Sequence, residues 1–172
     1  LDDGTYPTIL FRPWHEHTGD WFWWCEGNND PEDIKTLWRH TVHYLRDTLG
    51  IHNFLYVYST DTVATEEQYL RSYPGDEYID MMGIDIYRDV EEDNREAFTK
   101  RLKLVVEIAE KHGKIPALTE TGYAKHDEVN WWTDFLLEAI NSDPTAKRIA
   151  LVKTWANYGG DQYWSIYPGH PE

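Results

Sequence analysis

The chain alternates short apolar runs with longer amphipathic ones along most of its length, and this alternation limits the folds open to it. Each short run has the length and the β-branched or aromatic content of a buried strand. Each long run carries apolar residues at the three- and four-residue spacing of a helix that packs on a sheet. Repeated strand–helix units of this kind predict an α/β fold with a parallel sheet.

The pattern predicts five strands and four helices. The predicted strands are residues 8–11, 54–58, 81–86, 116–119 and 149–153. The predicted helices are residues 33–48, 65–73, 94–111 and 128–141. Gly50 and Gly113 follow two of these helices, in the position where glycine commonly ends a helix.

The number of strand–helix units separates two α/β architectures. Successive strand ends lie about 28 to 46 residues apart, which is close to one unit each. A doubly wound open sheet would fit 172 residues, but its glycine-rich phosphate turn follows none of the strands. An eight-stranded barrel needs about 250 residues. We therefore predict a (β/α)8 TIM barrel that is incomplete in this chain, with residues 1–172 forming part of a single barrel domain.

Two glutamates stand at the ends of predicted strands. Glu16 lies in the sequence RPWHEHTGDW, and Glu120 lies in ALTETG. The carboxyl ends of the strands form the face of a parallel barrel on which chemistry takes place. A pair of carboxyl groups there can cleave a glycosidic bond, because one protonates the leaving oxygen while the other attacks or activates water. The pair therefore predicts a glycosidase.

Aromatic residues, at 15% of the chain and including nine tryptophans, support a sugar ligand. Tryptophan is rarely buried completely, because its N–H needs a partner. We therefore expect the cluster of residues 21–24, which reads WFWW, to line a cleft as well as to pack in the core.

Charge and cysteine content exclude several other classes of function. The sequence holds 16 basic and 31 acidic residues, a net charge of -15, which repels nucleic acid and anionic membrane surfaces. The apolar runs are too short to span a membrane. Cys25 is the single cysteine, so an internal disulfide is impossible. A neutral ligand is favoured.

Two alternatives remain at this point. His15 and His17 form a His-x-His pair, with which metal-dependent barrel hydrolases often begin a metal site. No histidine lies at the other strand ends, so we predict neither a metal nor another cofactor. A carbohydrate-binding protein without catalysis would also use clustered tryptophans, but such modules are usually β-sandwiches.

Four motifs together resemble glycoside hydrolase family 26. They are RPWHE at 12–16 with Gly19 and Trp21, GIDIY at 83–87, TETG at 119–122 and WAN at 155–157. The resemblance extends over essentially the whole chain. It implies a retaining endo-β-1,4-mannanase on a (β/α)8 barrel, with no metal in catalysis, and it makes the predicted strands numbers four to eight.

The resemblance also implies roles for residues of the first motif. Glu16, after strand four, would be the general acid/base. His15 and Trp21 would shape the site around it. The acid needs a raised pKa, and we expect the rings of Trp14 and Trp21 to raise the pKa of Glu16 by desolvation.

The later motifs would supply the other half of the site. By the same resemblance Glu120, after strand seven, would be the nucleophile. Tyr87 would bond and orient it, with Asp85 nearby, and a hydrogen bond from Tyr87 would keep the carboxylate ionised. Trp155, after strand eight, would form a platform for the sugar.

The implied substrate is mannan, glucomannan or galactomannan, with β-1,3-xylan and mixed-linkage β-glucan as alternatives within the family. A polymer of this size is degraded outside the cell, so we expect a secreted, periplasmic or cell-surface location. Strands one to three and the helix after strand eight are missing from the pattern. An open sheet of five strands has two exposed edges, so we expect the chain to need strands from another segment or chain, or to self-associate.

Overall fold

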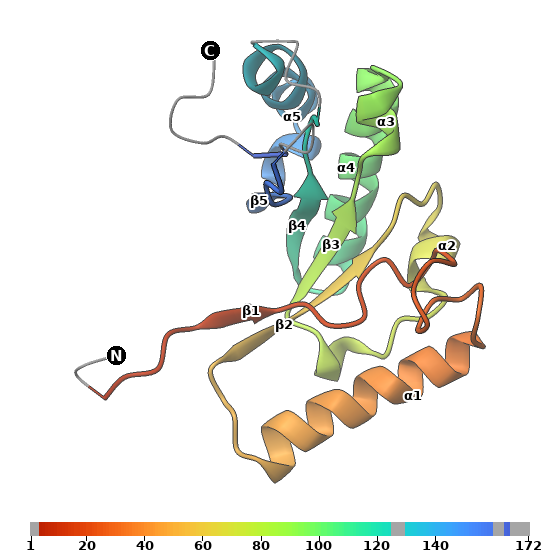
Figure 1. The fold of residues 1–172 in the computed structure, drawn as a ribbon, viewed down its shortest axis with the longest axis vertical. Helices are drawn as coiled ribbons and strands as arrows, with labels where there is room; N and C mark the ends of the chain where they lie inside the picture. Colours follow the sequence, from red (N-terminus) through yellow and green to blue (C-terminus); the bar gives the residue numbers. More distant parts are fainter. Residues whose placement is uncertain (1–3, 125–129, 160–163, 166–172) are drawn as a thin grey trace.

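The fold is a curled parallel sheet of five strands with helices along its outer side (Figure 1). It comes from a computed structural model that describes residues 4–124, 130–159 and 164–165. The strands are adjacent in chain order and all neighbouring pairs are parallel. They are β1 (Ile9–Phe11), β2 (Phe54–Thr60), β3 (Met81–Asp85), β4 (Ile115–Thr121) and β5 (Leu151–Thr154). The predicted incomplete barrel is confirmed as a curled half-barrel.

Within the described residues, five α-helices connect the strands. They are α1 (Pro31–Val42), α2 (Glu66–Leu70), α3 (Arg88–Glu91), α4 (Arg95–Lys111) and α5 (Glu138–Asn141). Proline begins α1, where its missing N–H costs nothing, and the Asn94 side chain caps α4 by accepting from the N–H of Ala97 at 3.0 Å.

The helix predictions hold with local differences. The predicted helix 33–48 is confirmed, but its second part, His43–Thr48, is π-helical. The last predicted helix begins at residues outside the described part and continues as a π-helical segment, Trp132–Leu137, before α5. Short 3₁₀ turns at Asp76–Tyr78 and Ala146–Arg148 were not predicted, nor was α3, because three or four residues are too few to show a helical period.

The two faces of the sheet have different neighbours because side chains alternate along each strand. One face packs against the helices and forms the main core. The inner face carries a smaller apolar cluster of Val57, Met81 and Ala117, with Leu151 against it. The main core includes Tyr56, Tyr58, Met82, Ile84 and Leu118 from the strands and Trp38, Phe98 and Leu102 from the helices.

The inner face becomes polar toward the carboxyl ends of the strands. Two residues beyond the apolar cluster, the buried side chains of Ser59 and Thr119 lie within 2.9 Å of each other. Gly83 lies between them on β3, and a Cβ there would stand 2.3 Å from the Thr119 methyl carbon. Glycine at this position therefore lets the polar side chains meet across the sheet.

An extra residue in β4 changes the direction of its last side chains. Ile84 pairs with Leu118, but the next residue, Asp85, pairs with Glu120. The β4–β5 ladder shifts at the same place. Such a bulge re-aims side chains, and here it lets both Thr119 and Glu120 reach the inner face.

β1 and β5 are the two edges of the sheet within the described part of the chain. Large apolar side chains on these edges are exposed, among them Ile9, Leu10 and Val152. No helix among the described residues is long and apolar enough to cross a membrane.

The packing of α4 predicts an unequal response to two identical substitutions. Leu102 is fully buried against the sheet, whereas Leu137 is 51% exposed. Leu102→Ala should lower the free energy of unfolding by about 2 to 5 kcal/mol, because it leaves a cavity in the main core. Leu137→Ala, the matched control, should change it by less than about 0.5 kcal/mol. Urea unfolding followed by tryptophan fluorescence measures both, and equal losses would contradict this core.

Candidate active site

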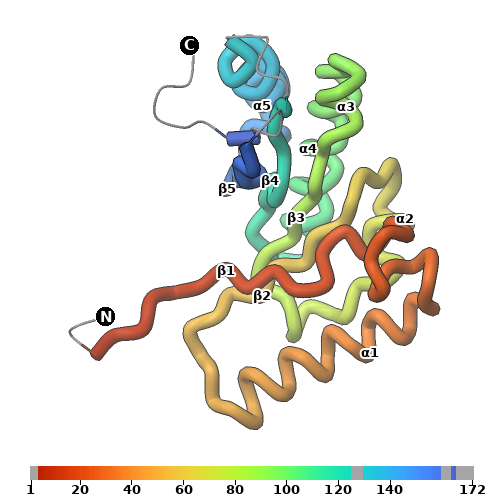
Figure 2. The backbone as a smooth tube through the Cα atoms, in the orientation of Figure 1, coloured from red at the N-terminus to blue at the C-terminus, as the bar shows by residue number. Residues whose placement is uncertain are grey.

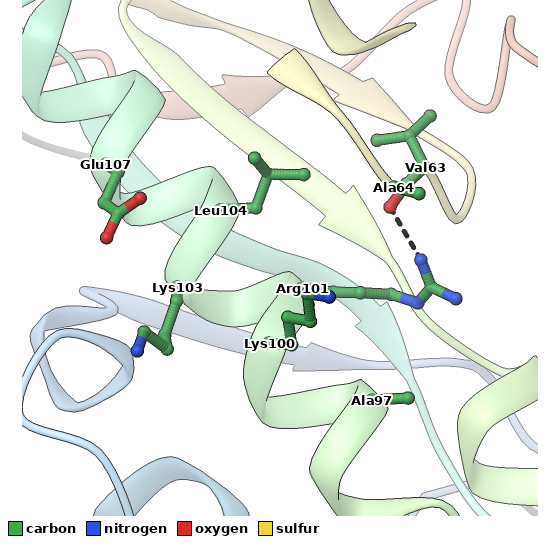
Figure 3. Close-up of a pocket in the computed structure, with 8 residues that line it drawn as sticks. All are labelled: Val63, Ala64, Ala97, Lys100, Arg101, Lys103, Leu104 and Glu107. Atoms are coloured by element: carbon green, nitrogen blue, oxygen red, sulfur yellow. Dashed lines mark hydrogen bonds between the residues drawn. The ribbon is translucent and has the colours of Figure 1, made fainter.

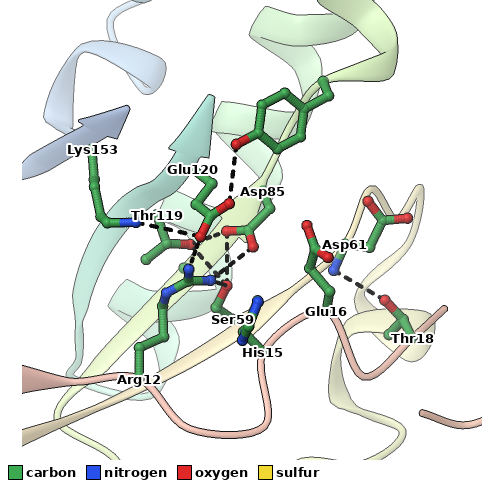
Figure 4. A network of polar contacts seen from close by, with 12 residues as sticks. Arg12, His15, Glu16, Thr18, Ser59, Asp61, Asp85, Thr119, Glu120 and Lys153 are labelled. Atoms are coloured by element: carbon green, nitrogen blue, oxygen red, sulfur yellow. Dashed lines mark hydrogen bonds and ion pairs between the residues drawn. The ribbon is translucent and has the colours of Figure 1, made fainter. Parts of the chain in front are cut away.

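Three buried carboxylates meet at the carboxyl ends of the strands. They belong to Glu16 in the segment after β1, Asp85 at the end of β3 and Glu120 in β4 (Figure 4). One oxygen of each lies within 4.8 Å of one oxygen of each other. Within the part of the chain that the structure describes, no other histidine, cysteine, aspartate and glutamate side chains form such a group.

Arg12 compensates the charge of two of these carboxylates. Its Nη1 atom donates to Asp85 at 2.8 Å and to the Ser59 hydroxyl at 3.1 Å, and its Nη2 atom forms an ion pair with Oε1 of Glu120. Lys153 approaches the same Oε1 atom at 3.3 Å from β5. Two cations thus converge on one oxygen of Glu120 (Figure 4).

The second oxygen of Glu120 is held by Tyr87. The Tyr87 hydroxyl donates to Oε2 of Glu120 at 3.0 Å, a contact that the family resemblance implied. Burial, together with the negative charge of Glu120, raises the pKa of Tyr87, so the hydroxyl keeps its proton and remains a donor. Both oxygens of the carboxylate therefore have fixed partners.

Asp85 has its own set of donors. The hydroxyl groups of Thr119 and Ser59 donate to its Oδ1 atom at 2.7 and 2.9 Å, and Arg12 binds Oδ2. Burial raises the pKa of Asp85 to about 6, while the Arg12 charge acts in the opposite direction. Asp85 is thus a fully buried acid that links Arg12 to the polar layer of the inner face.

Glu16 differs from the other two carboxylates because no cation contacts it among the described ion pairs. Burial raises the pKa of Glu16 to about 7, and the negative charge of Asp85 contributes to this rise. The Trp21 indole donates to its Oε2 atom at 2.9 Å and lowers the pKa in part. Glu16 is therefore near half-protonated at neutral pH.

The raised pKa of Glu16 agrees with the expected desolvation, and Trp21 has a second effect as well. Burial does raise the pKa of Glu16, but the N–H of Trp21 opposes this effect. The described contacts of Trp14 are with other residues. Its indole donates to the Thr41 hydroxyl at 3.1 Å, and its ring meets the rings of Trp23 and Trp24 edge-on.

The backbone around Glu16 is unusual. Both Trp14 and Glu16 have left-handed conformations, with φ of 53° and 52°, which non-glycine residues rarely adopt. The N–H of Glu16 donates to the carbonyl of Ser59 at 3.0 Å, and its carbonyl accepts from the Cys25 thiol at 3.3 Å. Strained residues of this kind concentrate at functional sites.

His15 and Trp155 occupy the borders of the carboxylate group. The His15 ring lies against Phe22, with 5.1 Å between ring centroids, and makes no hydrogen bond to Glu16 among those described. Burial and the Arg12 charge lower the pKa of His15 to about 4, so it is neutral. Trp155 directly follows β5, and its ring centroid lies 6.4 Å from that of Tyr87.

The His-x-His pair does not converge on a common point in this structure. His15 lies beside Phe22, whereas the fully buried His17 meets Tyr58, with 2.9 Å from its Nε2 atom to the tyrosine hydroxyl. The carboxylate group itself is the arrangement that could hold a cation. Arg12 already provides positive charge there.

The cluster of residues 21–24 divides as the sequence suggested. Trp21 and Trp23 are 52% and 64% exposed, while Phe22 and Trp24 stack on each other at 4.3 Å. A Cβ on Gly19 would stand 2.4 Å from the Trp21 ring, so glycine is needed for Trp21 to lie where it reaches Glu16. Trp21 thus remains an exposed flat side chain that contacts a carboxylate, whereas Trp23 is exposed farther along the same segment.

Sequence reasoning assigned no role to Arg12, Ser59, Thr119 or Lys153. Arg12 and Lys153 could have been found, because each is a basic residue at a strand end in a strongly acidic chain. The contact between Thr119 and Asp85 could not be found, because alternation would place Thr119 and Glu120 on opposite faces and only the bulge in β4 brings both to the same face.

A groove on the outer side of the fold is separate from these residues. It lies between α4 and the segment after β2 and has a volume of about 500 Å³ (Figure 3). Arg101 closes one side by donating to the carbonyl of Val63 at 2.7 Å. The residues that line it include none of the three carboxylates.

Comparison with known proteins gives consistent matches. The sequence model of Glycosyl hydrolase family 26 matches residues 1–163. A mannan endo-1,4-beta-mannosidase of Bifidobacterium adolescentis is 37% identical over 92% of this chain, which corresponds to 17% of the relative. An endoglucanase H of Acetivibrio thermocellus is 38% identical over 46% of this chain and 9% of the relative.

The fold also matches solved structures. A family 26 β-mannanase from Bacteroides ovatus has a TM-score of 0.89 and 38% identity, and the match covers 98% of this chain and 48% of that one. The chain therefore spans about half the length of this relative. Because the family model matches nearly the whole sequence, the chain belongs to glycoside hydrolase family 26.

Proposed function

We propose that this chain carries both catalytic carboxylates of a retaining endo-β-1,4-mannanase. The observation that carries the proposal is the approach of Glu16 and Glu120, whose nearest carboxylate oxygens lie within 4.8 Å at the carboxyl ends of parallel strands. Carboxyl groups about 5 to 5.5 Å apart suit double displacement, whereas inverting enzymes need roughly 6.5 to 9.5 Å to admit a water. The separation favours retention.

Glu120 would be the nucleophile. Arg12, Lys153 and Tyr87 hold its two oxygens in place, so the carboxylate is positioned for attack on the anomeric carbon. The attack forms a glycosyl–enzyme ester and breaks the bond to the leaving sugar. In the second step water displaces the ester and regenerates the carboxylate.

Glu16 would be the general acid and then the general base. With a pKa of about 7 it carries a proton in much of the population at neutral pH and can donate it to the leaving oxygen. The charge of Glu120 is one cause of that raised pKa. The charge disappears when the ester forms, so Glu16 becomes a stronger acid and remains ionised to accept a proton from water.

The sugar would bind across two aromatic side chains, the exposed Trp21 and the half-buried Trp155. Trp21, beside Glu16, and Trp155, beside Tyr87, flank the carboxylate group from opposite ends of the sheet. His15 would contact a sugar hydroxyl as a neutral ring. Mannan, glucomannan or galactomannan is the proposed substrate, in line with the name of the Bifidobacterium relative.

A glucan substrate is the second candidate, since one relative is an endoglucanase. Assays of reducing ends released from mannan, xylan and mixed-linkage glucan distinguish these substrates. A polymeric substrate also favours a secreted, periplasmic or cell-surface location.

We also propose that residues 1–172 are part of one catalytic barrel. The exposed edges at β1 and β5 are where its remaining strands would pair, and the relatives of known structure are about twice as long. The activity measurements below use a protein in which those strands are present.

Removing either carboxylate should abolish most of the activity. Glu120→Gln should lower kcat on mannan by more than about 10³-fold, because no other group can form the ester. Glu16→Gln should lower it by about 10² to 10⁴-fold. The exposed Glu67→Gln is the control and should retain full activity. Hydrolysis that survives Glu120→Gln with the fold intact would exclude Glu120 as the nucleophile.

The pH profile should report the Glu16 proton. The general acid works when protonated, so kcat/KM should fall as pH rises through about 7. Trp21→Phe removes the donor that favours the ionised form, so the pKa of Glu16 should rise and the alkaline limb should move upward by about one pH unit.

The control for this shift is Trp23→Phe. Trp23 lies in the same segment, but its described ring contacts are with Trp14 and Trp24. Its replacement should leave the alkaline limb in place. A downward shift in Trp21→Phe would show that Glu16 is not the group that titrates there.

The open edges predict the behaviour of the 172-residue chain by itself. Unpaired strand edges associate with one another, so light scattering should give a mass above the 20.4 kDa of a monomer. The isolated chain should release few reducing ends, whereas a protein with the remaining strands should release many. A monodisperse monomer that unfolds cooperatively would contradict the need for further strands.

A further inference from the structure

We propose that His17 is a positioning residue for the segment that follows β1 and carries Glu16. It fixes this segment to the sheet through buried hydrogen bonds that involve Tyr58 and Tyr69 and end on β3. The assignment of an acid/base to Glu16 rests on the proposed function. The anchoring of the segment does not, and it can be tested without any assay of activity.

The chain of bonds begins one residue after Glu16. The Nε2 atom of His17 lies 2.9 Å from the Tyr58 hydroxyl on β2. That hydroxyl donates to the Tyr69 carbonyl in α2 at 2.8 Å, and the Tyr69 hydroxyl donates to the Gly83 carbonyl on β3 at 2.8 Å. The side chains of His17, Tyr58 and Tyr69 are fully buried.

The direction of these bonds fixes the state of the histidine. A carbonyl can only accept, so the single proton of the Tyr58 hydroxyl goes to Tyr69. His17 must then donate from Nε2, which leaves Nδ1 without a proton. Burial lowers the pKa of His17 to about 4, so the ring is neutral, while the Trp14 backbone beside it acts in the opposite direction. Among the described side-chain bonds, the one with Tyr58 is the polar contact that joins the ring to the sheet.

The segment needs an anchor because its backbone is strained. The left-handed residues Trp14 and Glu16 stand on either side of His15, and relaxation of either would turn the Glu16 carboxylate away from Glu120. In Figures 1 and 2 the segment runs from β1 toward α2. A hydrogen bond joins the two parts: the carboxylate of Glu26, farther along the segment, accepts from the hydroxyl of Ser72, just beyond α2, at 2.6 Å.

Cys25 is a built-in reporter of this anchoring. It is the only cysteine in the sequence, it is fully buried, and its thiol donates to the carbonyl of Glu16. A reagent can reach the thiol only when the segment lifts from the sheet or when the protein unfolds. These two routes differ in their dependence on urea, because global unfolding exposes far more surface.

The test measures the rate at which an aromatic disulfide reagent labels Cys25. Tyr58→Phe removes one oxygen and leaves the Nε2 proton of His17 without an acceptor. His17→Met removes the ring. Each should raise the labelling rate in low urea by about tenfold, with little dependence on urea. His17→Gln retains an N–H donor and should restore part of the protection.

Two controls separate the anchor from general instability. His43 is exposed in the π-helical segment after α1, and His43→Gln should leave the labelling rate unchanged. Val42 is buried in the main core, and Val42→Ala should raise labelling only with a steep dependence on urea. If His17→Met does not fold, Tyr58→Phe decides the question. A rate in Tyr58→Phe within twofold of that of the unaltered protein would overturn the proposal.

Measurement of kcat and KM gives a second test of the anchor, in a protein that contains the remaining strands. A displaced Glu16 would lower kcat by about tenfold or more, with a smaller change in KM, because the acid is needed in the transition state. If the variants label faster but the unaltered protein has no glycosidase activity, the anchor is supported and the proposed function is contradicted. Unchanged labelling would contradict the anchor whether or not the enzyme is active.

Discussion

The ion pairs of Arg12 are the contacts on which the site depends. Burying carboxylates without a counter-charge is unfavourable, and two of the three carboxylates obtain theirs from this one side chain. β1 and β4 are separated by two strands, which in a flat sheet would place them about 14 Å apart, at about 4.8 Å per strand. Arg12 can reach Glu120 only because the sheet curls. The charge cluster and the curvature of the half-barrel therefore support each other.

The partners of the two glutamates differ in a way that suits different roles. Glu120 has two cations and a tyrosine hydroxyl on its oxygens, whereas Glu16 has one indole donor and a buried, negatively charged neighbour. Environments that favour ionisation of one carboxyl and protonation of the other allow a nucleophile and an acid to work at one pH. The raised pKa of Glu16 also lowers the stability of the folded protein. Its folded form holds a proton that the unfolded chain has lost, so between about pH 4.5 and 7 stability falls as the pH rises.

Sequence patterns identified all five strands because each is a short apolar run whose length and spacing match a strand–helix unit. They also placed Glu16, Asp85, Tyr87 and Glu120 at one edge of the sheet, since parallel strands end on the same side. The bulge at Thr119 and Glu120 could not be predicted, because it depends on the register of two ladders at once. The left-handed conformation of Glu16 could not be predicted either. Its backbone contacts Ser59, which is distant in sequence, and Cys25, which lies in a loop.

The simple strand order has a consequence for how the protein is made. Each strand pairs with the one that precedes it in the chain, so a growing chain can add strands one after another as it leaves the ribosome. The pair of Arg12 and Glu120 is an exception, because 108 positions separate the two residues. Contacts over such distances close late. During synthesis Arg12 is exposed first and its partner Glu120 emerges much later, so the carboxylate group is completed only after most of the sheet that supports it has formed.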